Sequence, residues 1–333
     1  MIPDMDALNN ILEHFNKTTV LVIGDLMLDR YMYGNVSRLS PEAPVPLVDI
    51  SHEIYRLGGA AHAGEIIHGL GGDVVTVGVI GNDWFGRQLT GLLKEDAINT
   101  TGITECNDRP TTVKTRIIAE RQYILRLDRE IRSPLSQVQE SALLRFLQDT
   151  IVSVDVILIS DYNKGIITKT VLKEIIALSK KYDKPIVVYP KIDQSFDYKG
   201  IHTFITTLEN AVELTKIRQI NETSIRNIGQ WLLSSLECQF ILISRGKEGM
   251  TLFDKKGSVT HVPPVTKDVI PVTGNIDTVA CITALSLSSC NNNLTADIVR
   301  LANVGADIVP GHLESTVITQ TDIRLSLKKS GGC

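Results

Sequence analysis

The stretch "TVLVIGD", residues 19–25, decides the fold. Four apolar residues from Val20 to Ile23 follow one another without a polar residue between them, and the run ends at Gly24 and Asp25. A strand exposed on one face alternates apolar and polar residues, whereas a continuous Val, Ile and Leu run is typical of a strand covered on both faces. Such strands belong to parallel sheets that lie between two layers of helices.

Four further segments have the same form, an apolar run that ends in a polar or glycine-containing loop. They are "VVTVGVIGND" (74–83), "VDVILISD" (154–161), "KPIVVYPK" (184–191) and "QFILISRG" (239–246). Between these segments and after them, apolar residues recur at helical spacing over residues 137–152, 168–181 and 295–309, the last with Thr295 as its N-cap. Because strands and helices alternate, we predict an α/β fold with a doubly wound, mainly parallel sheet.

Two stretches, residues 31–57 and 111–128, differ from the rest of the chain. The first is rich in Pro, Ser and β-branched residues and has no helical period, and the second alternates in places like a strand. We interpret the two together as a small antiparallel β flap, or lid, that stands off the main sheet. A small exposed sheet needs a cover, so we expect the flap to pair with a second subunit in a homodimer.

The composition limits the classes of function. The net charge is −4 and no long block of Lys and Arg occurs, so we expect no nucleic-acid partner. No apolar run reaches the roughly 18–20 residues that span a bilayer, and the acidic, amphipathic start "MIPDMDALNNILEHF" is unlike a secretory signal. The five cysteines form no CxxC pair, which is typical of reduced thiols in a cytoplasmic protein.

Four polar residues follow directly after predicted strands: Asp25, Asp161, Lys191 and Arg245. Ligands of doubly wound sheets bind beyond the carboxyl ends of the strands. Any one of these residues could simply end its strand, which polar residues often do. Their convergence on one edge of the sheet favours a ligand site.

The segment "VTGNIDTVA", residues 272–280, has the form of an anion-binding turn that leads into a helix. The first N–H groups of a helix have no partner within the helix, and the helix dipole favours negative charge there. A phosphoryl group in transfer would be held at such a turn, and Asp277 could accept a proton from an attacking hydroxyl. Alternatively, Asp277 is an ordinary acidic residue at a helix N-terminus.

Read in order, six segments resemble the ribokinase-like (PfkB) carbohydrate kinases, and within them most closely the D-glycero-β-D-manno-heptose-7-phosphate kinases. They are "VLVIGDLMLDRYMYGNVSRLSPEAPVPLV", "LGGAAHAGEIIHGLGGDVVTVGVIGND", "RPTTVKTRIIAERQYILRLDRE", "SDYNKGIIT", "SRGKEGMTLF" and "VTGNIDTVA". The opening segment and the third are the most specific to the heptose kinases, whereas single glycine pairs are weak signals. The resemblance covers roughly residues 18–320 and implies one kinase domain over residues 1–333.

The resemblance implies an activity as well as a fold. An enzyme of this kind uses ATP and Mg²⁺, with a monovalent cation possible, to phosphorylate the anomeric hydroxyl of heptose 7-phosphate to the 1,7-bisphosphate. That product is a precursor of ADP-heptose and the lipopolysaccharide core. The chain ends before a nucleotidyltransferase domain could fit, so we expect a separate nucleotidyltransferase to carry out adenylyl transfer.

The resemblance also implies roles for individual residues. The general base would be Asp277, and Gly274 with the backbone amides of Asn275, Ile276 and Asp277 would form the anion hole. The residues expected to bind the sugar phosphate are Asp29, Gly58, Gly59, His62, Lys114, Arg116, Arg121, Arg126, Asp161 and Lys164. Of the four flap cations in that set, we expect two or three to touch substrate; arginine offers a two-pronged donor for phosphate. The residues expected near the nucleotide are Lys191, Asn210, Ser244, Arg245, Gly246, Gly249 and Asn303, and Glu213 would hold magnesium through water.

Four departures from the family pattern bear on function. The turn is Gly-Asn-Ile-Asp where the family has GAGD, and a β-branched Ile276 restricts both close approach and unusual φ values. His62 replaces an asparagine, and it either shifts sugar selectivity or makes an equivalent hydrogen bond. Tyr189 stands where related kinases have the acid of "DPK", and the NxxE pattern at 210–213 needs a small shift to align.

Three hypotheses therefore stay open. The first is an ATP-dependent heptose-7-phosphate kinase, and the second is a PfkB-type kinase of another sugar, suggested by His62 and Tyr189. The third is a catalytically impaired pseudokinase, suggested by Ile276 and opposed by the retention of Asp277 and the basic flap. A Rossmann dehydrogenase and a Walker A P-loop protein are disfavoured, because the first strand is not followed by GxGxxG and no GxxxxGK[ST] occurs.

Overall fold

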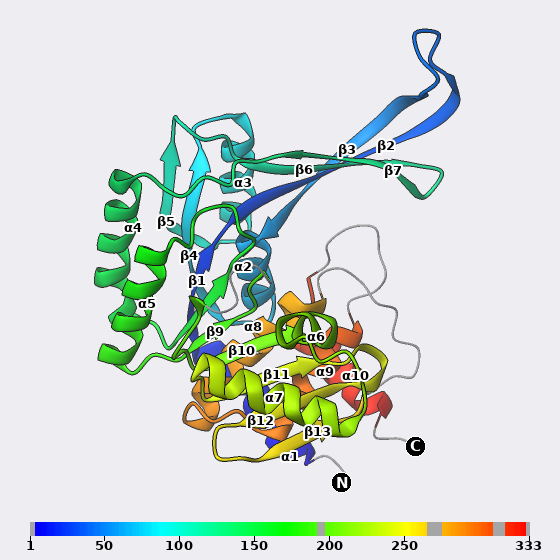
Figure 1. Ribbon diagram of the computed structural model, residues 1–333. Helices are drawn as coiled ribbons and strands as arrows, with labels where there is room; N and C mark the ends of the chain where they lie inside the picture. Colours follow the sequence, from blue (N-terminus) through cyan, green and yellow to red (C-terminus); the bar gives the residue numbers. More distant parts are fainter. Residues whose placement is uncertain (1–3, 192–196, 265–274, 309–316, 331–333) are drawn as a thin grey trace.

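The computed structural model describes residues 4–191, 197–264, 275–308 and 317–330. Its centre is a nine-stranded sheet, which runs through the body of the molecule (Figure 1). From one edge to the other the strands are β13 (Val259–Val262), β12 (Met250–Asp254), β11 (Phe240–Ser244), β10 (Thr203–Thr207), β9 (Ile186–Val188), β8 (Val156–Ser160), β1 (Thr19–Gly24), β4 (Asp73–Gly81) and β5 (Asn99–Cys106). The seven strands from β11 to β5 are parallel, and β12 and β13 add an antiparallel hairpin at one edge.

Helices cover both faces of this sheet. One face is packed by α1 (Met5–His14), α2 (Ala60–Gly69), α3 (Trp84–Glu95), α8 (Asn275–Leu287), α9 (Ala296–Ile308) and α10 (Gln320–Ser330). The other is packed by α4 (Gln137–Thr150), α5 (Lys169–Tyr182), α6 (Leu208–Thr215) and α7 (Glu222–Leu236). In β1, Val20 and Val22 face the first layer while Leu21 and Ile23 face the second, which explains the unbroken apolar run. The prediction of a doubly wound, mainly parallel sheet is confirmed.

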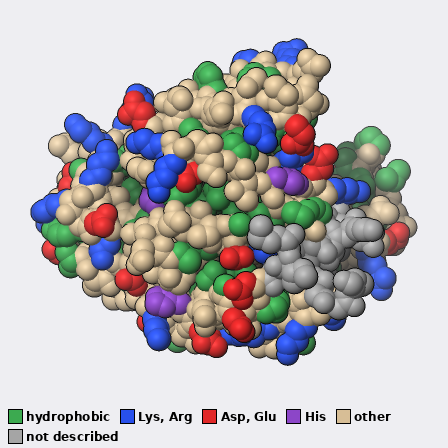
Figure 2. Space-filling model, turned by 90° about the horizontal axis from the view of Figure 1, so that it is seen from below, with side chains coloured by type: hydrophobic (Ala, Val, Ile, Leu, Met, Phe, Trp, Pro, Cys, Tyr) green, Lys and Arg blue, Asp and Glu red, His purple; other side chains and the backbone are tan. Residues whose placement is uncertain are grey.

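The predicted elements fall close to the observed ones. All five apolar runs form strands of the main sheet, and the three helical stretches form α4, α5 and α9. Thr295 caps α9, because its Oγ1 accepts a hydrogen bond of 3.4 Å from the backbone N–H of Ile298. None of the described helices is long and apolar enough to cross a bilayer. On the face seen in Figure 2, basic side chains are interspersed with acidic ones.

The flap is a separate four-stranded sheet that projects from the body of the molecule (Figure 1). Its strands, in spatial order, are β3 (Pro46–Gly59), β2 (Leu26–Leu39), β6 (Thr112–Ala119) and β7 (Gln122–Arg129). The predicted antiparallel pairing holds for β2 with β3 and for β6 with β7, whereas β2 and β6 are parallel. The difference arises because α2, β4, α3 and β5 intervene between the two hairpins, so the chain re-enters the flap at its base.

The register of the flap sorts its side chains into two faces, because residues directly opposite each other in a ladder share a face. Asp29 pairs with Lys114, and Arg116 pairs with Arg126, so these polar residues lie on one face. Leu125 and Leu127, on alternate positions of β7, lie on the opposite face and are each about half exposed, at 51%. The flap therefore has a charged face and an opposite, apolar face, on which Leu125 and Leu127 are exposed and which Arg30 and Arg129 share.

Candidate active site

The N-terminus of α8 lies at the carboxyl ends of β8 and β9. The helix begins at Asn275, so Ile276 has a helical conformation, which is sterically allowed for every L-residue, and its side chain packs against the core. The concern that Ile276 must adopt an unusual φ therefore does not apply. Asp277 lies in the first turn and is half-buried, while Gly274 lies outside the described residues.

A tyrosine hydroxyl contacts the carboxylate of Asp277. Tyr162, in the loop that follows β8, donates its O–H toward Oδ1 and Oδ2 of Asp277, each at 2.8 Å. Burial and the charge of Asp277 raise the pKa of Tyr162 well above its usual value, so the phenol is a protonated donor. The ammonium of Lys191, which follows β9, lies 5.3 Å from the centre of the Tyr162 ring.

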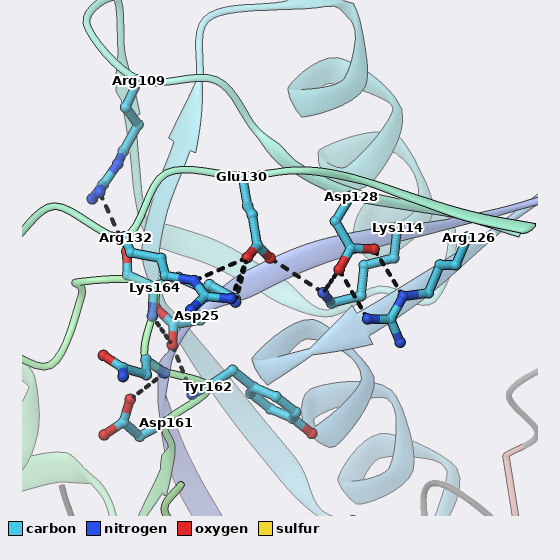
Figure 3. A network of polar contacts seen from close by, with 11 residues as sticks. Asp25, Arg109, Lys114, Arg126, Asp128, Glu130, Arg132, Asp161, Tyr162 and Lys164 are labelled. Atoms are coloured by element: carbon cyan, nitrogen blue, oxygen red, sulfur yellow. Dashed lines mark hydrogen bonds and ion pairs between the residues drawn. The ribbon is translucent and has the colours of Figure 1, made fainter. Parts of the chain in front are cut away.

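Asp25 fixes the loop that carries Tyr162. Its carboxylate is buried and accepts backbone hydrogen bonds from Tyr162 at 2.7 Å, Lys164 at 3.1 Å and Ile166 at 3.4 Å (Figure 3). Burial and the charge of Asp161 raise the pKa of Asp25 to about 6, against the lowering by these three hydrogen bonds. Asp25 thus organises the edge of the sheet, and its two oxygens are directed to the protein's own backbone.

The electrostatics of Asp277 suit a general base. Burial raises its pKa above the usual value, and the charge of Asp29 adds to the rise. His62, Tyr162 and Lys191 act in the opposite direction and favour the ionised carboxylate. Asp277 also lines a small cavity between α8 and the ends of β8 and β9, together with Ser160 and Tyr189 among others.

His62, one of the residues that depart from the family pattern, lies next to this carboxylate. It is buried on α2, and its Nδ1 is 2.9 Å from Oε2 of Glu65 on the next turn. Burial alone would lower the pKa of His62, but the hydrogen bond and charge of Glu65, with the charges of Asp277 and Asp29, raise it. The charges of Glu65, Asp277 and Asp29 thus favour the protonated form of the imidazole.

Asp29 lies where the flap leaves the body of the molecule. Its carboxylate is buried and forms an ion pair of 2.8 Å with Arg116 of β6. Gly58 of β3, which pairs with Met27 of β2, leaves room for this carboxylate, because a Cβ at Gly58 would lie 3.2 Å from the Asp29 carboxyl carbon. Gly59 has a φ of 57°, and a Cβ there would lie 2.4 Å from the carbonyl oxygen of Asp25. The predicted glycine pair thus shapes the junction that carries Asp29.

The predicted flap cations are held by acidic residues of the flap itself (Figure 3). Lys114 lies 3.2 Å from Asp128 and 3.3 Å from Glu130, and Arg126 lies 2.9 Å from Asp128. Glu130 also accepts a hydrogen bond of 2.8 Å from Lys164, which ties the flap to the loop after β8.

Arg121 is placed differently. It lies in the turn between β6 and β7 with a φ of 63°, exposed at the tip of that hairpin. At about 3.3 Å a residue, that is roughly 20 Å along the strand from Lys114. The structure thus brings Lys114, Arg116 and Arg126 to one face and leaves Arg121 apart.

Asp161 and Tyr189 complete the edge near Asp277. Asp161 is buried and accepts hydrogen bonds from the Tyr198 hydroxyl at 2.6 Å and from the backbone of Asn163 at 2.8 Å. Both of its oxygens are therefore bonded within the protein. Tyr189 has its pKa raised by burial and by the charge of Asp277, which places a second tyrosine beside the carboxylate.

Four of the residues predicted to lie near the nucleotide, Ser244, Arg245, Gly246 and Gly249, lie between the end of β11 and the start of β12. Ser244 is the last residue of β11, and Arg245 after it makes ion pairs with Glu222 at 2.7 Å and with Glu248. Gly246 has a φ of 56°, and Gly249 has a φ of 83° and packs closely on Val262.

Further structural contacts occupy Arg245 and Asn303. Asp25, Asp161, Lys191 and Arg245 were predicted to converge, but Arg245 does not contact the other three. Its side chain contacts Glu222, Glu248, Thr251 and His261 instead. Asn303 is buried on α9 and donates to the carbonyls of Val262 at 3.2 Å and Pro263 at 3.0 Å.

The residues proposed for magnesium lie on α6. The backbone N–H of Asn210 bonds to the capping Thr207 at 3.2 Å, its side chain is bonded to Tyr189, and Glu213 is exposed. Among the described residues, no group of three or more His, Cys, Asp or Glu side chains is placed to hold a metal ion. The described donors thus do not form a protein cage, and an ion here would need ligands from a bound phosphate and water.

The sequence analysis did not predict three residues of the candidate site: Tyr162, Glu130 and Glu65. Tyr162 lies within "DYNKG", between two residues that were selected, and its position directly after a strand could have identified it. Glu130 ends the segment "LRLDRE", and Glu65 follows His62 at helical spacing. The partners of Tyr162 and Glu130 are distant in sequence, and Glu65 has its partner because His62 replaces the asparagine of the family pattern. These contacts are therefore visible only in the folded structure.

Comparison with known proteins identifies relatives of this chain. A family model described as pfkB family carbohydrate kinase matches residues 17–319. The "Bifunctional protein HldE" of Geobacter metallireducens is 35% identical over 314 residues, which cover 94% of this chain and 64% of that protein. The protein of the same name from Geotalea uraniireducens is 37% identical over 303 residues, 91% of this chain and 61% of its own length. The chain thus spans less than two thirds of these relatives.

Solved structures share the fold. Phosphofructokinase-2 from Escherichia coli, in complex with potassium, matches with a TM-score of 0.74 at 14% identity, covering 94% of this chain and 98% of that one. Ribokinase from Arabidopsis thaliana, complexed with ribose and ATP, matches with a TM-score of 0.72 at 13% identity, covering 93% and 98%. At such identities the likeness concerns the fold alone.

Proposed function

Because the chain belongs to the PfkB family of carbohydrate kinases, we propose that it transfers the γ-phosphoryl group of ATP to the anomeric hydroxyl of D-glycero-β-D-manno-heptose 7-phosphate. The product would be the heptose 1,7-bisphosphate. Similarity to the heptose kinases in the opening segment and in the flap supports this choice of sugar. The observation that carries the proposal is the position of Asp277 in the first turn of α8, beside the flap residue Asp29.

The chemistry follows from that position. Asp277 takes the proton of the anomeric hydroxyl while the oxygen forms a bond to the γ-phosphorus of ATP. The bond from that phosphorus to the bridging oxygen breaks, and ADP leaves with the electron pair. The first-turn amides of α8 have no acceptor within the helix, so they are available to the negative charge of the phosphoryl group.

The charged face of the flap supplies a site for the 7-phosphate. Lys114, Arg116 and Arg126 share that face with Asp29, which would bind sugar hydroxyls. Their present partners are Asp128, Glu130 and Asp29, so a phosphate must compete with these carboxylates. Lys164 borders the same cluster through Glu130. A phosphorylated sugar therefore fits the flap better than an uncharged one.

The nucleotide would lie at the other half of the sheet edge, near Lys191 and the ends of β11 and β13. Magnesium would reach the site with the phosphates of ATP, with Glu213 acting through water. A monovalent cation is a further expectation of the family resemblance. The proposal also places the protein in the cytoplasm, where ATP and sugar phosphates are found.

The apolar face of the flap supports a homodimer. Leu125 and Leu127 are each 51% exposed on one face of the edge strand β7, and Tyr123 is similarly exposed on the same strand. An exposed edge strand with apolar side chains is a site for association, and a second copy of the chain would cover it.

A kinase of another sugar is the second candidate, and a specific observation favours it. His62 and Tyr189, two residues that depart from the family pattern, both lie beside Asp277. Substitutions that meet at the acceptor site are expected to change the sugar rather than the nucleotide.

The test compares acceptors that differ only in the phosphate. We expect ADP release with heptose 7-phosphate to exceed release with unphosphorylated heptose by at least 100-fold in kcat/KM, because buried charged contacts would be lost. Arg126→Ala should raise KM for the phosphorylated sugar about tenfold and leave kcat/KM for the unphosphorylated sugar unchanged. Equal rates on both acceptors would contradict the heptose phosphate proposal and favour another sugar.

A further inference from the structure

The contact between Tyr162 and Asp277 joins two parts of the chain that are 115 residues apart. The phenol oxygen lies 2.8 Å from each of the two carboxylate oxygens, so the hydroxyl lies symmetrically at the end of the carboxylate. A donor in this position restrains rotation of the carboxylate about its terminal torsion, which is otherwise broad and soft. The remaining lone pairs of both oxygens then point away from the phenol.

Tyr162 is itself held in place. Its backbone N–H is bonded to Asp25 at 2.7 Å, and Asp25 also holds the N–H groups of Lys164 and Ile166. The loop that carries the phenol is thus anchored to a buried carboxylate at the end of β1 (Figure 3). Lys191 lies against the ring at 5.3 Å from its centre. The hydroxyl is therefore set by the body of the protein.

We propose that Tyr162 is a positioning residue for the phosphoryl transfer: its hydroxyl holds the carboxylate of Asp277 in the orientation that accepts the proton of the sugar. This inference rests on the proposed function, in which Asp277 is the base. Tyr162 need not touch the sugar or the nucleotide. It acts through Asp277 by limiting the orientations of the carboxylate and by stabilising its ionised form.

The second effect gives a measurable signature, because hydrogen bonding to a carboxylate favours its charged form. The titratable or charged groups that influence Asp277 come from several elements: His62 of α2, Asp29 of β2, Tyr162 after β8, Tyr189 and Lys191 after β9, and Cys281 of α8 itself. Of these, Tyr162 donates a hydrogen bond to the carboxylate. Removing only its hydroxyl should raise the pKa of Asp277, and the loss of activity on the acid side should move to higher pH.

The experiment measures kcat/KM of Tyr162→Phe against pH with Mg-ATP and heptose 7-phosphate. We expect the acid limb to move up by about one pH unit and kcat near neutral pH to fall about tenfold, with KM for ATP unchanged. Tyr198→Phe is the matched control, because it removes a buried hydroxyl that bonds to Asp161. It should leave the acid limb where it is in the unaltered enzyme.

Two further measurements keep the inference testable. Replacing Tyr162 by 3-fluorotyrosine keeps the ring and its packing but makes the phenol a stronger donor, and the acid limb should move to lower pH. Carbon-13 NMR of the Asp277 carboxyl, assigned with Asp277→Asn, reports the same titration without turnover. An unchanged Asp277 titration in Tyr162→Phe, or an equal loss of activity at every pH, would overturn the positioning role.

The outcome separates this inference from the proposed function. If Asp277→Asn keeps near-normal turnover, Asp277 is not the base and the proposed chemistry fails. If Asp277→Asn is inactive while Tyr162→Phe has the normal pH profile, only the role of Tyr162 fails.

Discussion

His62 and Glu65, one turn apart on α2, form a pair in which Nδ1 of the imidazole lies 2.9 Å from Oε2 of the carboxylate. The family pattern has an asparagine at the position of His62, which carries no charge. The pair brings a basic group next to Asp277 and Asp29, and the pKa of His62 is raised, largely through Glu65 against the effect of burial. The departure therefore changes the electrostatics of the proposed base.

Restoring the asparagine tests this effect. His62→Asn removes a positive charge that lowers the pKa of Asp277, so the pKa of the base should rise. Because the base acts as a carboxylate, the acid limb of kcat/KM should move to higher pH, by roughly half to one unit. Glu65→Gln, which keeps the histidine but weakens its charge, should produce a smaller shift in the same direction. A shift to lower pH in His62→Asn would contradict the account.

Lys164 and Glu130 tie the flap to the body of the molecule. Burial would raise the pKa of Glu130, but the hydrogen bond from Lys164 and the charge and hydrogen bond of Lys114 lower it to about 2. A depressed pKa means that the group stabilises the fold at neutral pH. That contribution is present above pH 4.5 and is lost as the pH falls toward 2.

Glu130→Gln should therefore lower the free energy of unfolding at pH 7 by about 2 kcal/mol, because Lys164 loses its carboxylate partner and Lys114 loses one of its two. Chemical denaturation at several pH values measures this difference, which should shrink as the pH falls below 4.5. Glu237→Gln, which breaks the exposed pair with Lys199, is the matched control and should have no measurable effect. A pH-independent difference for Glu130→Gln would show that the ion pairs are not its cause.

The apolar face of β7 makes the predicted homodimer testable. Leu127→Glu places a charge in the middle of that face and should convert the dimer to a monomer at micromolar concentration, as measured by sedimentation velocity. Val138→Glu replaces a side chain that is 78% exposed on α4, outside the flap, and should leave the dimer intact. A native chain that is monomeric at the same concentration would exclude the flap-mediated dimer.

Much of the fold could be predicted because its signals are local. The run from Val20 to Ile23 reads as a doubly covered strand without knowledge of its neighbours, and Thr295 signals the start of α9 by its side chain alone. The strand order of the flap was harder to predict, because the parallel pairing of β2 with β6 depends on how the intervening chain returns to the flap. No short sequence window contains that information.

The sequence could predict where residues of the candidate site lie in the fold, but it could not predict which residues they contact. Residues at strand ends, such as Asp25 and Asp161, were selected correctly as edge residues, yet the structure directs both carboxylates to the protein itself. The contact of Tyr162 with Asp277 spans 115 residues and depends on the placement of α8 over β8. Spacing along the chain could identify Asp277 as a candidate base but could not identify the residue that contacts its carboxylate.

One measurement tests the central claim most directly: ADP release from Mg-ATP with D-glycero-β-D-manno-heptose 7-phosphate, comparing the native chain with Asp277→Asn. We expect turnover by the native chain and a loss of about 100-fold or more in kcat in the variant, with the variant still folded and still binding the sugar phosphate. Such a result would mean that the Gly-Asn-Ile-Asp turn carries out the chemistry. Near-normal turnover in the variant, or binding without turnover by the native chain, would contradict it.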